Sequence, residues 1–302
     1  MSDAAGGTVF DIGYRSYAGA REGRGRAVRA IFDDGVRIAL GLGRGGRAKI
    51  LPWFFIVVLS AIGLVMAIVA GAAARMMGPE AAQRADLTLH NDYYGIASII
   101  LFVFAAVVAP ELLCRDRREG TIQLYLVRPV TATDYVLARW AAMVAVMLAA
   151  AWLPQVVLLL GHAAGAAAPG AYLRAHWLDV PRFLAAGLVM VTYVTTLAML
   201  TASFTTRRAY AAIFLVGLVA ISAPFTVGLA SELGSPVGPW ISMFTLTNIP
   251  VHVNDVIFQE VSELTEDAPA RELSDRVRVA WWLLWTAGPG VLLWWRYRRL
   301  TP

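Results

Sequence analysis

The sequence predicts an all-α polytopic membrane protein with six transmembrane helices. Of its 302 residues, 58% are hydrophobic and only 16% are charged, whereas a soluble domain keeps roughly a quarter of its residues charged. The mean hydropathy is +0.61. The charged residues are clustered, and several stretches between them are long enough to cross a hydrocarbon core of roughly 30 Å. Composition and charge clustering together therefore indicate a chain that crosses a bilayer several times.

Six stretches with no charge near their centres meet the length of a membrane span. A central Arg or Asp would cost about 3 kcal/mol on an insertion scale. We predict spans at 50–73, 93–113, 135–160, 183–205, 209–230 and 278–295. The second has a short apolar core that ends at Pro110-Glu111. Because proline removes a backbone donor, we expect a break or kink there.

Three segments outside the spans have their own character. Residues 1–25 are expected to form a flexible cytoplasmic N-terminus. Residues 26–49 are expected to form an amphipathic interfacial helix and a hinge, since apolar residues recur every three or four positions from Arg26 to Leu42. A flexible basic tail is the alternative there. The outer connection 231–277 begins apolar and turns acidic, so an ordered or re-entrant cap and a solvated loop both remain open.

The glycines at 41, 43 and 46 fit a nucleotide-site pattern, but a surface helix precedes them and a span follows. That pattern requires a preceding strand and a soluble helix after it. No Lys-Ser or Lys-Thr follows Gly46, which excludes a phosphate-binding P-loop. The glycines are better explained as a flexible hinge that precedes the six-helix domain at 50–302.

The distribution of Lys and Arg predicts the orientation. With six spans the two termini share a side, and that side carries nineteen basic residues against seven on the other. The richer side is expected to face the cytoplasm. We therefore predict a multi-pass protein of the cytoplasmic (inner) membrane with both termini inside. Because the basic residues alternate by loop, no nucleic-acid partner is expected.

Catalytic and metal-binding motifs are missing from the sequence. There is no H-E-x-x-H and no G-x-S-x-G. The four histidines (90, 162, 176 and 252) all fall in predicted outer loops, where we expect them at the surface, and Cys114 is the only cysteine. The span centres lack the charged residues that ion-coupled carriers use. We expect no catalytic residue, metal site or cofactor in this chain, and energy that enters from outside it.

The segment 114–134 between the second and third spans is the most distinctive part of the sequence. Charges alternate from Asp116 to Glu119, a short amphipathic stretch follows at Thr121–Val127, and Pro129 ends it before the third span. A short helix with such sharp ends is suited to dock on a partner at the cytoplasmic face. An ordinary connecting loop is the alternative that these residues leave open.

The order of residues around this segment resembles the type-2 ABC exporter permeases. The matching residues are Pro110-Glu111, Asp116 to Thr121, Arg128-Pro129, and Tyr135 with Arg139. The resemblance implies that residues 50–302 form a permease domain and that 114–134 is a coupling loop whose helix sits on a separate ABC-type ATPase subunit. It also implies a dimer with a second permease copy or homologue, and ATP and Mg²⁺ held by the partner subunit.

The same resemblance assigns contact residues for the ATPase subunit. They are Asp116, Arg117, Arg118, Glu119, Gly120, Thr121, Leu124, Arg128 and Pro129. Separately, the fourth span is rich in hydroxyl groups, and Thr192, Thr195 and Thr196 are candidates for a substrate path. Hydrogen bonds to the same helix or between helices are the commoner role of such residues.

These expectations combine into one function, the permease subunit of an ABC transporter, of the exporter type by resemblance, with no ATPase site of its own. A membrane-embedded assembly or anchor protein is the first alternative, but it leaves the coupling loop unexplained. An intramembrane enzyme is the second, and it needs paired polar catalytic residues that we do not find within the spans.

Overall fold

The structure is a computed structural model, and it describes residues 23–43, 45–78, 90–126, 130–166 and 168–299. Every element of these segments is a helix, which confirms the all-α class. Nearly all of the predicted flexible N-terminus, residues 1–22, lies outside the described residues.

Five described helices are long and apolar enough to cross a membrane. They are α2 (Arg47–Met77), α4 (His90–Arg118), α6 (Ala132–Gly165), α8 (Asp179–Ser203) and α9 (Arg208–Leu233). Each contains most or all of one predicted span and extends beyond it at one or both ends. Runs of apolar residues thus located these helices, while their exact ends were not predicted.

The sixth predicted span coincides with α12 (Asp275–Arg298), a helix of 24 residues. It is not among the five because charges at both ends leave a short uncharged stretch, and that stretch contains five tryptophans. Tryptophan belongs to the membrane interface more than to the hydrocarbon core. The helix itself is therefore confirmed, and its passage through the membrane remains a prediction.

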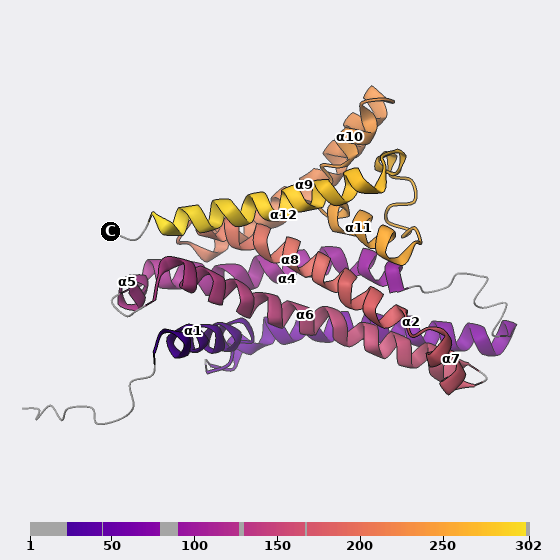
Figure 1. Cartoon of the computed structure of the whole chain (residues 1–302), viewed down its shortest axis with the longest axis horizontal. Coiled ribbons are helices and arrows are strands. Elements are labelled where there is room, and N and C mark those ends of the chain that lie inside the picture. Colours follow the sequence, from indigo (N-terminus) through magenta and orange to yellow (C-terminus); the bar gives the residue numbers. More distant parts are fainter. Residues whose placement is uncertain (1–22, 44, 79–89, 127–129, 167, 300–302) are drawn as a thin grey trace, which may run out of the picture.

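The helices form an elongated bundle with α4, α6 and α8 at its centre. The helix α6 packs against α2, and α4 packs against α8, which also contacts α12. Figure 1 shows α1, α5 and the C-terminal end of α12 at one end of the bundle, and α7 and α11 at the other. We call these the inner end and the outer end. Charged residues collect at both ends because the middle of the bundle is apolar.

Helix α1 (Arg24–Ala39) forms where the amphipathic pattern predicts it and packs along α6. The approach is closest at Gly35, where an added Cβ would lie 2.7 Å from the Cβ of Ala142. The chain then turns into α2 through Gly41, whose φ of +67° and contact with the carbonyl of Ala48 leave no room for a side chain. The predicted glycine hinge is thus a tight turn.

The expected break at Pro110 does not occur, because α4 continues through it as one helix to Arg118. Prolines also lie within α2, α6, α9 and α12. Neighbouring helices, side chains or local adjustments of the helix can satisfy the carbonyls that such prolines free. The prediction of a break was therefore wrong, and α4 packs against both α8 and α6.

The outer connection is ordered. It contains α10 (Gly238–Ser242), α11 (Asn248–Phe258) and the 3-10 helix η1 (Pro269–Glu272). Helix α11 packs against α8, α12 and α4, and most of its residues are buried. Between α6 and α8 lies the short helix α7 (Pro169–Ala175). The alternative of a solvated acidic loop at 231–277 is therefore wrong for the part around α11.

Candidate functional site

The candidate site is the inner end of α4 and the segment that joins it to α6. The last turn of α4 carries Asp116 and Arg117, so the first part of the predicted coupling loop is helical. Gly120 follows with φ of +70°, a left-handed conformation that favours glycine. The short helix α5 (Thr121–Leu126) follows and lies at the inner end of the bundle (Figure 1). The predicted short helix thus exists, bounded at its start by Gly120.

Asp116 is buried and faces the protein interior. Its carboxylate accepts hydrogen bonds from the Tyr135 hydroxyl at 2.7 Å and from the guanidinium of Arg139 at 2.8 Å. Arg139 is completely buried, and its other terminal nitrogen lies 2.8 Å from a carboxylate oxygen of Asp34 in α1. We call Asp34, Asp116 and Arg139 the inner ion cluster. It joins α1, α4 and α6 through one shared guanidinium.

Aromatic side chains connect α5 and α12 to this cluster. The ring of Tyr135 lies against Tyr125 of α5, with centroids 5.6 Å apart, and stacks on Tyr297 of α12 at 6.0 Å. The guanidinium carbon of Arg139 is 5.6 Å from the centre of the Tyr135 ring. Side chains from five helices thus meet at this point, and α5 contacts the cluster through Tyr125.

The predicted contact residues divide into two sets. Arg118, Glu119 and Gly120 are exposed. The side chain of Arg117 instead points back into the protein and donates to the carbonyl of Ser203 at the end of α8. Asp116, as described, is also internal. The structure thus presents an exposed turn at 118–120 and supports it from beneath.

Of the four other predicted contacts, only Thr121 is fully described. The Thr121 hydroxyl donates to the carbonyl of Asp116 at 3.3 Å and links the turn to α4. The side chain of Leu124, and the whole of Arg128 and Pro129, lie outside the described residues. After that gap, Thr131 caps α6 by a reciprocal pair of hydrogen bonds with Asp134. Such a capping box fixes where α6 begins.

The three threonines of α8 make different contacts. The hydroxyls of Thr192 and Thr196 donate to carbonyls of their own helix, at 2.7 and 2.6 Å, and Thr196 also accepts from the indole of Trp140. The Thr195 hydroxyl is buried and has no hydrogen-bond partner among the described residues. Hydrogen bonding within and between helices thus accounts for Thr192 and Thr196, and the substrate path stays a prediction.

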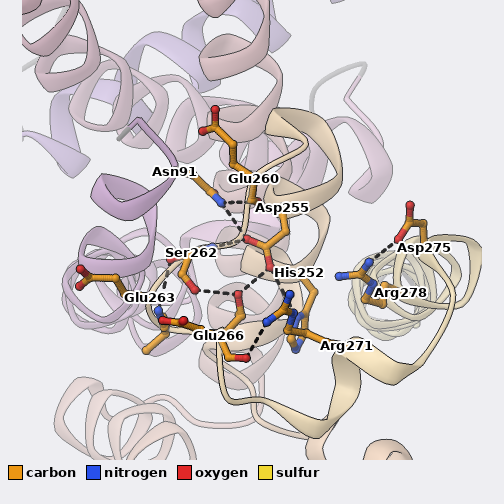
Figure 2. A network of polar contacts seen from close by, with 12 residues as sticks. Asn91, His252, Asp255, Glu260, Ser262, Glu263, Glu266, Arg271, Asp275 and Arg278 are labelled. Atoms are coloured by element: carbon orange, nitrogen blue, oxygen red, sulfur yellow. Dashed lines mark hydrogen bonds and ion pairs between the residues drawn. The ribbon is translucent and has the colours of Figure 1, made fainter. Parts of the chain in front are cut away.

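At the outer end lies a second polar network that the sequence did not predict. Figure 2 shows Asp255 of α11 at its centre. Its carboxylate accepts from the amide of Asn91 at 2.7 Å, the backbone N–H of Ser262 at 3.0 Å and the hydroxyl of Thr265 at 2.6 Å. We call these four residues the outer network. The signal in the sequence was the single Asp in an otherwise uncharged apolar stretch. Such an aspartate, when buried, needs hydrogen-bond donors from other segments.

Two histidines expected at the surface are buried. His252 is completely buried, neither ring nitrogen has a hydrogen-bond partner among the described residues, and its nearest carboxylate oxygen, in Asp255, is 3.9 Å away. Burial, with the charges of Arg278 and Arg271, lowers the pKa of His252 to about 4. His90 is also buried and contacts Gln155. The prediction was wrong for these two histidines because His90 begins α4 and His252 lies in α11, and packing between helices at the outer end buries both.

Across the described part of the chain, no group of three or more His, Cys, Asp or Glu side chains is placed to hold a metal ion. The polar groups gather instead in the inner ion cluster, the exposed turn and the outer network. The arrangement suits binding and mechanical connection between helices.

A bundle of helices with several spans, polar at both ends, is a multi-pass membrane protein. Residues 53–300 match the family described as ABC-2 family transporter protein, so the chain belongs to this family of ABC transporter permeases. Permeases of the family are generally partnered with an ABC-type ATPase subunit. No curated protein matches the chain.

Proposed function

We propose that this chain is the membrane subunit of an exporter powered by ATP, which a separate subunit binds with Mg²⁺ and hydrolyses. One observation carries the proposal beyond the family assignment. The exposed turn at 118–120 and α5 are joined to the inner ion cluster and, through it, to α1, α4, α6 and α12. A docking element needs this kind of rigid connection to transmit a movement.

The proposed orientation places the inner end in the cytoplasm of the inner membrane. Nineteen of the basic residues belong to the segments assigned to this end, and positively charged loops remain cytoplasmic. In this orientation α1 lies along the membrane surface and α12 is the sixth span, with tryptophans near both of its ends. Both chain termini are then cytoplasmic.

The proposed mechanism is a shift between two states of the permease. A bound partner shifts such an equilibrium only as far as it contacts the two states differently. The differential contact would be made by the exposed turn and α5, which move when two ATPase subunits close on ATP. The inner ion cluster would carry that movement into α4 and α6, while the outer network holds the opposite end together.

A second copy of the chain, or a homologue, is proposed to complete the transporter. The apolar segments of α4 and α8 are 67% buried, whereas that of α9 is only 17% buried. Lipid covers most such surfaces, but the large side chains of Phe214, Ile221 and Phe225 all lie exposed along α9. The proposed substrate path would involve α8, where Thr192, Thr195 and Thr196 are its candidates.

The α9 contact can be tested by cross-linking because Cys114 is the only native cysteine. It is buried and donates to backbone carbonyls, so Cys114→Ser keeps that donor. In this background, Phe225→Cys should cross-link two copies in membranes, and Trp177→Cys at the exposed outer surface serves as the control. Equal cross-linking at both positions, or none at Phe225→Cys, would contradict a dimer through α9.

The docking proposal is tested with two matched pairs of exposed charges. Arg118→Ala with Glu119→Ala removes charges from the turn, while Arg29→Ala with Asp33→Ala removes an exposed pair from α1. We expect the first variant to bind its ATPase subunit roughly tenfold more weakly, as loss of a strong interface contact does. Copurification and permease-stimulated ATP turnover measure the effect.

The control variant should retain both properties. If the 118–119 variant kept normal binding and turnover, the turn would not be the docking site. If no ATPase subunit copurified with the wild-type chain from its native membrane, the alternative of an anchor or assembly protein would be favoured.

A further inference from the structure

A cavity of about 630 Å³ opens at the inner end, between the end of α1, the start of α2, the end of α4 and the first residue of α9. Its apolar wall includes Ile38, Leu51 and Val107. Its polar rim contains three arginines and two glutamates, which are Arg47, Arg115, Arg208, Glu111 and Glu119. One wall thus suits hydrocarbon and the rim suits a charged group.

The charges of the rim do not cancel. Arg115 pairs with Glu119 at 3.2 Å, and Arg208 pairs with Glu111. The exposed side chain of Arg47 has no ion-pair partner among the described residues. In addition, the Nε of Arg208 is shielded from solvent and lacks an acceptor there. Among the described residues, the rim therefore has one surplus positive charge and one buried donor with no acceptor.

We propose that this cavity binds an anionic phospholipid from the surrounding leaflet, with its headgroup phosphate between Arg47 and Arg208 and an acyl chain along Leu51 and Val107. The start of α2 and of α9 and the end of α4 are the places where apolar spans give way to charged residues. Headgroups lie at that depth, and basic pockets between helices there bind anionic headgroups.

The cavity also reaches the proposed docking turn, because Arg115 and Glu119 belong to its rim. A lipid seated there would contact the same end of α4 that the ATPase subunit is proposed to approach. The lipid site itself goes beyond the proposed function and depends on it only for which leaflet supplies the lipid. Its test uses the permease alone, so a failure here is separate from a failure to bind the ATPase subunit.

The experiment is native mass spectrometry of the purified full-length chain, titrated with dioleoyl-phosphatidylglycerol and, in parallel, dioleoyl-phosphatidylcholine. Arg47→Gln should weaken phosphatidylglycerol binding roughly fivefold, the contribution of one arginine near an anionic headgroup. Arg47→Lys should retain most of the binding. Lys49→Gln is the matched control, since Lys49 is an exposed cation in the same helix that does not line the cavity.

Three results would overturn the proposal. They are equal losses for Arg47→Gln and Lys49→Gln, equal binding of the two lipids by the wild-type chain, and displacement of the lipid by millimolar inorganic phosphate, which would indicate a site for small anions. If Arg47→Gln lowers the melting temperature, Leu51→Trp provides a second test. This larger side chain would occupy the part of the cavity beside its apolar wall and would leave every charge in place. It should therefore also reduce phosphatidylglycerol binding.

Discussion

Both ends of the bundle bury an aspartate, and the two are stabilised in different ways. At the inner end, Asp116 faces the fully buried Arg139, which a second carboxylate from α1 also contacts. At the outer end, Asp255 has three neutral donors and no arginine within ion-pair distance among the described residues. The inner cluster connects helices distant in sequence to an exposed turn, whereas the outer network closes a loop onto the start of α4.

The difference indicates what each end is built to do. A buried ion pair contributes little net stability, but breaking it leaves a charge without compensation. Hydrogen bonds from neutral donors tolerate replacement better. We therefore expect the inner end to behave as one connected unit that transmits movement and the outer end to behave as a static closure.

The largest expected effect is from Asp116→Ala, which leaves Arg139 with only the half-exposed Asp34. Loss of one partner of a buried pair costs about 3–5 kcal/mol in free energy of unfolding. Denaturant titration in detergent micelles measures this cost. In a double-mutant cycle, Arg139→Met should remove much of the penalty of Asp116→Ala. Strictly additive losses would show that the inner ion cluster is not a connected unit.

A smaller effect is expected from Asp255→Ala, which removes the acceptor shared by Asn91, Ser262 and Thr265. We expect water to enter the space left by the carboxylate and to replace that acceptor for most of the donors. The net loss should then be about 1–3 kcal/mol, the cost of one unsatisfied buried neutral group. The same titration compares it with Asp116→Ala. The proposed contrast between the two ends would be wrong if Asp255→Ala were the more damaging change.

The smallest expected effect is a pH dependence at the outer end. Burial raises the pKa of Asp255 above its ordinary value, against the lowering influence of its donors and of Arg278. A raised folded-state pKa favours the protonated carboxyl in the fold, so its stabilisation is complete below the ordinary pKa of aspartate and is lost as the pH rises through the folded-state value. The non-titrating Asp255→Asn variant should therefore gain stability relative to wild type as pH rises. A difference that does not change with pH would argue against the raised pKa.

Much of the helical fold could be predicted from the sequence. Apolar runs and the amphipathic period of α1 are local features, and burial in lipid or against a neighbour acts on each helix separately. Gly120 likewise sets the start of α5 through its own backbone conformation. The break at Pro110 was predicted wrongly because the support that α4 receives from α8 and α6 is not a local property.

The candidate site also has parts that the sequence predicts and parts that it does not. The exposed turn could be predicted because its charged residues and the short helix after them are adjacent in the sequence. Only the tertiary structure turned Asp116 and Arg117 inward, and only it brought Asp34 to Arg139 across 105 positions of the chain. The outer network and the cavity at the inner end also join distant segments. Pairing of buried polar groups is decided by packing in three dimensions, whereas membrane insertion follows from the composition of each segment alone.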